Sequence, residues 1–433
     1  MKKTKRGLSP FTKTALCIAL SGGLLAAAPL ARADAISDLK AQIDALQKKV
    51  EEMSAKQAAP AAAAPANVVT GGDIPGSFKL PGTNTSIKFG GYIKADAIYN
   101  SRSVGGTADQ LLEAGGIPLG SQAKGERGQL TMHARQTRFN MTTSTPSSLG
   151  EVKTFFEADF FSGGTSGNEV VSNSNGLRMR HGYGSIGGWL AGQTWSNFMD
   201  VGAGPELLDF GGPVGAIFIR QAQIKYTQKF AGGQWSASLE NPESNISGRG
   251  PVGDDRLPDV TGRVDLNVGK NRLTFTGMAR QIRIDQATAS DNKWGGAVGF
   301  SGVIPTVGKD SASFTTNYGN TLGRYVVGLF PDGAVKANGN LDLSNTWIAM
   351  ASYQHFWTAD LRSTVALSGT RTKFGQGVGG TQTRNAESAH LNLIWSPVKN
   401  TNVGLEYIYG HRTQRNGDAG VLNRMQASAQ YLF

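Results

Sequence analysis

Apolar and polar residues alternate in short segments from residue 87 to the end of the chain. In the first segment Ile87, Phe89 and Ile93 alternate with Lys88 and Lys94. A period of two places the two sets on opposite faces of a β-strand. Sixteen such segments are predicted to be strands. They begin near residues 87, 129, 151, 177, 189, 217, 234, 258, 272, 293, 310, 345, 360, 386, 400 and 422.

The connections between the predicted strands alternate in length. Residues 101–128, 162–176 and 196–215 form long connections, whereas residues 187–188 form a tight turn. Short turns on one rim and long loops on the other are typical of an outer-membrane β-barrel. Hydrocarbon cannot satisfy backbone N–H and C=O groups, so an exported, non-helical membrane chain must close its sheet. The sequence therefore predicts an all-β transmembrane fold, a 16-stranded antiparallel barrel over residues 87–433, with a soluble β-sandwich or propeller as the alternative.

A helical period precedes the strands. Six apolar residues are spaced alternately three and four apart, which is the a/d pattern of a heptad seam. They are Ile36, Leu39, Ile43, Leu46, Val50 and Met53. We expect a self-associating coiled-coil helix over residues 34–56, with an amphipathic helix that lies on another surface as the alternative. Residues 57–86 read as an Ala/Pro linker and an irregular lead-in to the barrel.

The first 33 residues predict a secretory signal peptide. They contain a basic start, an apolar stretch over residues 15–30, and Ala31-Arg32-Ala33 as an A-x-A cleavage site. The chain of 433 residues has a formal charge of +11, but six of its 43 basic residues lie in this segment. The remainder has 37 basic and 32 acidic residues, a balance of +5, which weakens any case for nucleic-acid binding. Cys17, the one cysteine, would leave with the signal, together with any disulfide, thiolate or Cys-based metal site.

If the apolar positions of each strand face lipid, the intervening positions face the lumen, and sixteen strands leave an aqueous channel. Basic residues on the lumen parity are Lys88, Lys94, Arg138, Lys153, Arg178, Arg180, Lys225, Arg263, Arg272, Arg280, Arg362 and Arg424. Acidic residues on the same parity are Asp96, Glu151, Glu157, Asp159, Glu240, Asp259, Asp265 and Glu406. Basic side chains lower the barrier for anions, and the arginine fork pairs carboxylates well. Alternatively, these bases only neutralise the neighbouring acids.

Two features do not follow that simple alternation. Arg135 and Arg220 lie on the lipid parity, so we expect them at a rim, a bulge or a protomer contact. Residues 196–215 mix large apolar side chains with acidic ones, which suits either a loop that packs inside and narrows the pore or an ordinary external loop.

The sequence nominates no catalytic or cofactor chemistry. Residues 182–187 match G-x-G-x-x-G, but no helix is expected after them, so they read as strand and turn glycines. The five histidines are scattered without the spacing of metal ligands. We therefore expect no enzyme activity, no cofactor and no metal site.

Several segments resemble the DcaP-like porins. They are GSFKLPGTNTSIKFGGYIKADAIYN (76–100), ARQTRFNMTT (134–143), LRMRHGYGSIGGWLAGQTWSNF (177–198) and the terminal Phe433, together with the coiled-coil opening. The resemblance covers essentially the whole chain after the signal. It implies a trimer of sixteen-stranded barrels with a periplasmic N-terminal coiled coil, and diffusion of small anions such as dicarboxylic acids. By matching motif, it places pore arginines at Arg138, Arg178 and Arg180.

These observations predict a porin in the outer membrane of a Gram-negative bacterium, through which small anionic solutes, carboxylates or dicarboxylates, diffuse passively. The expected partners are outer-membrane lipid and two further copies of the chain. The candidate pore-lining, anion-binding residues are Lys94, Arg138, Arg178, Arg180, Arg263 and Arg280. The main alternative is a general or sugar-preferring porin without strong anion selectivity. A lipid-cleaving barrel enzyme and a structural tether are further alternatives.

Overall fold

The computed structural model describes residues 31–58, 69–103, 105–120, 127–162, 171–251, 254–326 and 330–433. The chain divides into two compact units, with the boundary between Val68 and Val69. The predicted signal peptide lies almost entirely outside the described residues.

The first unit contains one helix, α1 (Ala31–Ala58). It covers the residues for which a coiled-coil helix was predicted. Ile43, Leu46 and Val50 of the heptad seam are exposed along it. A coiled coil needs further chains, so the association of α1 with other copies stays a prediction. Among the described residues, no helix combines the length and the apolar character needed to cross a bilayer.

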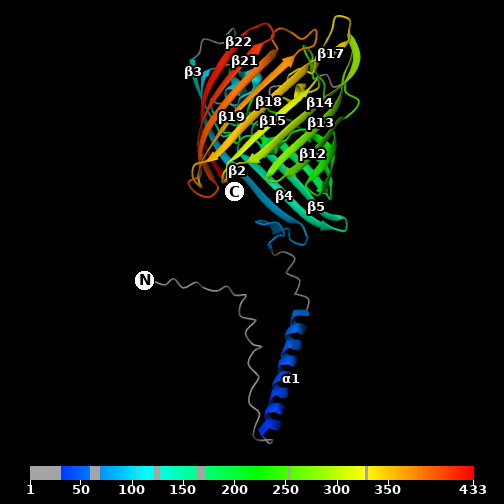
Figure 1. Cartoon of the computed structure of the whole chain (residues 1–433), viewed down its shortest axis with the longest axis vertical. Helices are drawn as coiled ribbons and strands as arrows, with labels where there is room; N and C mark the ends of the chain where they lie inside the picture. The colour runs from blue at the N-terminus through cyan, green and yellow to red at the C-terminus, as the bar shows by residue number, and fades with distance from the viewer. Residues whose placement is uncertain are drawn as a thin grey trace. The chain divides into compact units, whose positions relative to one another are not determined.

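The second unit is a closed antiparallel barrel (Figure 1). Its strands in the described part of the chain are β2 (Ser86–Arg102), β3 (Arg127–His133) continued by β4 (Arg138–Ser147), β5 (Gly150–Asp159), β6 (Arg178–Ile186), β7 (Trp189–Trp195), β8 (Arg220–Phe230), β9 (Gly233–Glu240), β12 (Asp259–Val268), β13 (Asn271–Gln286), β14 (Ala289–Pro305), β15 (Ser311–Gly319), β18 (Asn345–Phe356), β19 (Leu361–Lys373), β20 (Thr383–Trp395), β21 (Thr401–Gln414) and β22 (Ala419–Leu432). Because β3 and β4 occupy one position, the wall has sixteen strands, and each corresponds to one predicted segment. The predicted fold is confirmed.

The barrel closes where β22 pairs with β2 (Figure 1). The register runs from Tyr92↔Leu432 to Asn100↔Arg424. Because the barrel is closed, the backbone N–H and C=O groups of its first and last strands are hydrogen-bonded to each other. A sheet in hydrocarbon requires this, since no water is present to bond them. Along the strands, exposed apolar positions alternate with buried polar ones, as for Leu367 and Thr370 in β19. The outer surface is therefore apolar and the interior is largely polar.

Five short strands lie outside the barrel wall. They are β1 (Phe78–Lys79), which pairs with the start of β2, and β10 (Asn245–Ile246), β11 (Gly250–Pro251), β16 (Gly333–Val335) and β17 (Leu341–Leu343), which form a small second sheet.

Among the irregularities of the described wall, two β-bulges lie beside residues of the candidate functional site. Between the pairs Tyr92↔Arg138 and Asp96↔His133, three residues of β2 face the four residues of 134–137. A second shift occurs between β5 and β6, at Glu157 and Ala158. A bulge inserts one residue and redirects the side chains beside it. Both bulges lie next to the cavity described below.

Three loops pack inside the barrel. In the described parts of these loops, residues 105–120, 196–219, 320–326 and 330–344 contribute buried apolar side chains to one core cluster. Phe198, Tyr325 and their neighbours in this cluster contact inward apolar residues of the wall. The lumen is therefore narrowed by folded chain and is not an open cylinder.

Candidate functional site

The loop 196–219 crosses the lumen and is bonded to strands on several sides. Near its start, Asp200 accepts hydrogen bonds from Arg263 Nη2 (3.0 Å), Arg272 Nη1 (2.9 Å) and Ser301 Oγ (2.6 Å). These donors come from β12, β13 and β14. Charge-assisted hydrogen bonds of this kind are stronger than neutral ones, so this end of the loop is held firmly.

The middle of the loop is bonded to strands near the barrel closure. The backbone N–H of Leu208 donates to Glu406 Oε2 (2.5 Å), and Lys94 Nζ donates to the Leu208 carbonyl (2.6 Å). Further along, the Gly215 N–H donates to Ser368 Oγ (3.2 Å). Of the two alternatives for residues 196–215, the structure has the loop that packs inside the lumen.

A cavity of about 330 Å³ lies between this loop and the barrel wall. It is lined on the wall side by Tyr92, Gln136, Arg138, Arg180 and Trp195. The loop side is lined by Phe198, Met199, Asp200, Leu207, Asp209, Phe210, Pro213 and Phe218, among others. The cavity thus has a mainly apolar loop surface, with two carboxylates, that faces a wall with two arginines.

The arginines beside this cavity share two carboxylates. Arg178 forms a bidentate pair with Asp159 (3.0 and 2.9 Å). Arg180 bonds both Glu157 (2.7 Å) and Asp159 (2.9 Å), and Arg138 lies 3.4 Å from Glu157. Three fixed positive charges therefore meet two negative ones.

Arg220 adds a fourth positive charge. Its guanidinium carbon lies 4.6 Å from the ring centroid of Trp195 and 5.2 Å from that of Phe218. Within the described part of the chain no carboxylate lies in ion-pair range of it, and its buried Nη1 has no hydrogen-bond partner. Cation–π contacts hold the group in place without cancelling its charge. The cluster of Arg138, Arg178, Arg180 and Arg220 thus has an excess of positive charge.

Aromatic rings hold the loop against this basic cluster. Phe210 of the loop stacks on Phe161 with centroids 4.4 Å apart. The guanidinium carbons of Arg178 and Arg180 each lie 5.5 Å from the Phe210 centroid. Such contacts orient the guanidinium groups towards the cavity side of the wall.

A smaller cavity of about 160 Å³ adjoins the first, because Tyr92, Gln136 and Leu207 line both. Its other polar lining includes Lys94, Glu206, Arg362, Asn402, Ser428 and Gln430. Arg362 and Asn402 lie at the ends of β19 and β21 that follow short turns. The two cavities therefore lie next to each other along the loop.

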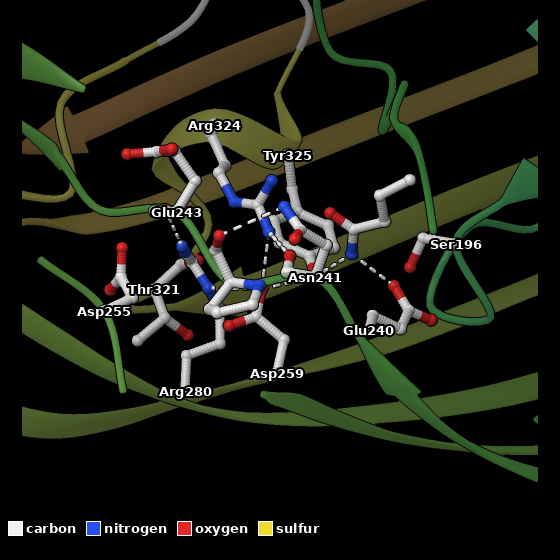
Figure 2. A network of polar contacts seen from close by, with 12 residues as sticks. Ser196, Glu240, Asn241, Glu243, Asp255, Asp259, Arg280, Thr321, Arg324 and Tyr325 are labelled. Carbon is white, nitrogen blue, oxygen red and sulfur yellow. Dashed lines mark hydrogen bonds and ion pairs between the residues drawn. The ribbon is translucent and has the colours of Figure 1, made fainter. Parts of the chain in front are cut away.

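Arg280 lies in a separate buried network, shown in Figure 2. It bonds Asp259 (2.9 Å) of β12 and Asp332 (2.9 Å) of the loop 320–344, and also donates to the Thr321 carbonyl (2.6 Å). Tyr325 donates to Asp259 (2.9 Å), and burial raises the pKa of the Tyr325 hydroxyl well above its ordinary value, so it remains a donor. This network fastens the loop to the wall.

Comparison with protein families decides what kind of barrel this is. The sequence matches the model of the DcaP outer membrane protein over residues 29–433. The chain belongs to the DcaP outer membrane protein family. Comparison with curated protein sequences gives no match.

Solved structures with the same fold include outer-membrane proteins. The crystal structure of the outer membrane channel DcaP of Acinetobacter baumannii has a TM-score of 0.73 at 24% identity, over 84% of this chain and 100% of that chain. In-vitro folded OmpT of Vibrio cholerae has a TM-score of 0.52 at 11% identity, over 81% and 98%. The trimer form of OmpT has a TM-score of 0.51 at 10% identity, over 81% and 99%. Such identities show the fold alone.

As a DcaP-family member, the chain is an outer-membrane porin. Its family and fold are those of channels and not of enzymes. In the described part of the chain, no group of three or more His, Cys, Asp or Glu side chains gathers as a metal site requires.

The six candidate residues occupy different environments in this DcaP-family porin. Arg138 and Arg180 line the larger cavity, with Arg178 beside them. Lys94 lines the smaller cavity but is bonded to Asp96 (3.1 Å). Anion binding by these residues stays a prediction.

The other two candidates fasten loops. Arg263 pairs with Asp200 and with Asp265 (2.8 Å), and Arg280 is fully buried between two carboxylates. For these two, the geometry favours the alternative in which lumen bases neutralise neighbouring acids.

Sequence reasoning placed Arg362 on the lumen side but included neither Arg362 nor Arg220 among the six candidate residues. Arg220 is the first residue of β8 and lies on the parity of the exposed Ala222 and Ile224, but its guanidinium packs against Trp195 and Phe218. Arg135 lies within the bulge at 134–137 and donates to the Ser162 carbonyl (2.8 Å), which agrees with the expectation of a bulge. The bulge between β5 and β6 leaves no such signal in the apolar pattern.

Proposed function

We propose that this DcaP-family porin is a passive, anion-preferring channel for small carboxylates and dicarboxylates. The observation that supports it is the charge excess beside the larger cavity, where Arg138, Arg178, Arg180 and Arg220 face two carboxylates. Positive charge in a narrow, low-dielectric passage raises the local anion concentration. Guanidinium groups also bind carboxylates through paired hydrogen bonds.

Reversal potentials across a salt gradient in planar bilayers test this proposal. We expect the wild type to prefer chloride over potassium. Arg220→Gln removes a charge that no carboxylate neutralises, so it should lower the anion/cation permeability ratio by about twofold or more. Arg371→Gln removes the same charge from an exposed outer position of β19 and should leave the ratio unchanged. A wild type that prefers cations would overturn the proposal.

We also propose a trimer, with α1 as a periplasmic coiled coil. The exposed heptad seam of α1 and the trimer form of the structurally similar OmpT support this assembly. Residues 1–33 would act as the export signal. Mass measurement of the detergent-solubilised protein would test the stoichiometry.

A sugar-preferring or general porin is the second candidate. It is favoured by the neutralisation of Lys94, Arg263 and Arg280 by carboxylates, and by the aromatic and amide lining of the larger cavity. Block of the ion current by oligosaccharides, with no effect of succinate, would support it over the anion channel.

A further inference from the structure

Arg362 holds a carboxylate that belongs to the porin's own internal loop. Its Nε donates to Glu206 Oε2 (2.7 Å) and its Nη2 donates to Glu206 Oε1 (2.6 Å), a bidentate arrangement. Gln354 Nε2 also donates to Glu206 Oε2 (2.6 Å). Donors from β18 and β19 therefore converge on one carboxylate, as in a site built to bind this group.

The donors of this site keep their positions without Glu206. Arg362 Nη1 donates to Ser396 Oγ (2.8 Å), and Nη2 also donates to Asn402 Oδ1 (3.3 Å). Ser396 Oγ in turn donates to Asn402 Oδ1 (2.7 Å). The guanidinium is thus oriented by residues of the wall and stays pre-organised when the carboxylate leaves.

The Glu206 side chain can leave without moving the loop. The loop backbone is fixed at Glu206 and just after it, because Asn392 donates to the Glu206 carbonyl (2.8 Å) and the Leu208 N–H donates to Glu406. The Glu206 side chain is 39% exposed, whereas that of Asp159, which holds the wall arginines, is fully buried. Glu206 is therefore open to solvent, and a solute carboxylate that takes its place would make equivalent hydrogen bonds to Arg362, so the exchange costs little.

We propose that Arg362 and Gln354 form a second carboxylate-binding site in the permeation route, which Glu206 occupies until a solute carboxylate displaces it. The proposal rests on the proposed function as a carboxylate channel. Both Glu206 and Arg362 line the smaller cavity, which lies next to the cavity beside the basic cluster, because Tyr92, Gln136 and Leu207 line both. Exchange of one carboxylate for another conserves the charge and the hydrogen bonds of Arg362. A solute is therefore bound briefly and released, which conduction requires.

Succinate binding to the purified full-length protein tests the proposal. The apparent dissociation constant is obtained from the succinate-dependent reduction of chloride current in planar bilayers. In Glu206→Gln the Arg362 site is vacated, so this constant should fall by about threefold to tenfold. When Arg362→Gln is already present, adding Glu206→Gln should not change the apparent dissociation constant of succinate further, because the two residues act through one site. Glu387→Gln, on the outer face of β20, removes a carboxylate elsewhere and should match the wild type.

Two results would overturn the inference. One is an unchanged succinate constant in Glu206→Gln, and the other is an equal fall of that constant in the Arg362→Gln background, which would indicate a general charge effect.

Wild-type selectivity separates the two proposals. If the wild type prefers anions and Glu206→Gln does not change the succinate constant, the proposal of a second site is wrong and the proposal of an anion channel stands. If the wild type prefers cations, both fail. Heat-modifiability on SDS gels confirms that each variant is folded.

Discussion

Asp159 sets how much positive charge the larger cavity presents. It accepts from both Arg178 and Arg180, and it is fully buried. A buried carboxylate between two arginines stabilises the wall and also cancels part of the field that attracts anions. Stability and selectivity therefore depend on the same side chain in opposite directions.

We expect Asp159→Asn to separate these two effects. The variant should raise the anion/cation permeability ratio by about twofold, because one negative charge leaves the cluster. It should also lower the free energy of unfolding by about 2 kcal/mol, since Arg178 loses its ion-pair partner while Arg180 keeps Glu157. Reversal potentials and urea unfolding in detergent measure the two changes. Equal selectivity of Asp159→Asn and Glu387→Gln would contradict the expectation.

At the scale of elements, the loop 196–219 determines the width of the route. Its polar contacts with the wall include ion pairs and hydrogen bonds between side chains and backbone groups. Asp200 accepts three of these hydrogen bonds. A loop held by such contacts depends on the ionisation of its carboxylates.

Acidification is expected to loosen this loop. Although burial opposes ionisation, hydrogen bonds from Arg272 and Ser301 and the charge of Arg263 lower the pKa of Asp200 below its ordinary value of 3.8. For a lowered pKa, the stabilisation is complete above the unfolded value and is lost as the pH falls through the folded value. Fluctuations of the open-channel current should therefore stay constant from about pH 7 to about pH 5 and increase below about pH 4.

The Asp200→Asn variant provides the comparison. It lacks the charge at every pH, so its current should already fluctuate at neutral pH and change little on acidification. Wild-type current that stays steady at about pH 3 would show that Asp200 does not hold the loop.

The strands could be predicted from the sequence, whereas the contacts of the internal loops and the bulge in β6 could not. Alternation in each strand reflects lipid on one side and water on the other, so all sixteen segments were found; β14 begins at Ala289, four residues before its predicted start. The loop carboxylates Asp200 and Glu206 lie in a segment where apolar and polar residues do not alternate regularly. Their arginine partners therefore could not be assigned from the sequence. The bulges at 134–137 and in β6 change the side-chain direction without changing the residue types.

At the scale of the whole molecule, the barrel depends on a close approach at the closure. Gly91 N–H and C=O exchange hydrogen bonds with Phe433 (3.3 and 3.1 Å). Gly91 has φ of 147°, and a Cβ there would lie 2.1 Å from the Arg138 carbonyl oxygen. The position therefore requires glycine.

We expect Gly91→Ala to destabilise the closed barrel by about 2 kcal/mol or more. The temperature at which the compact form converts on SDS gels should fall. Gly262→Ala in β12 is the matched control, because a Cβ there meets no atom within 4 Å. Similar conversion temperatures for the two variants would contradict the close-approach argument.

Removal of residues 34–56 tests the role of α1. The barrel is a compact unit of its own, so its single-channel conductance should not change. The proportion of SDS-resistant trimer should decrease, because the exposed seam of α1 no longer contributes to association. An unchanged proportion of trimer would show that α1 does not stabilise the assembly.

The pairing of β2 with β22 also makes the wall depend on complete translation. A polypeptide that ends before Ala419 would leave the backbone groups of β2 and β21 without partners, and the bilayer interior cannot hydrate them. A single seam between β2 and β22 thus makes the stability of the whole wall in a bilayer conditional on the presence of its final strand.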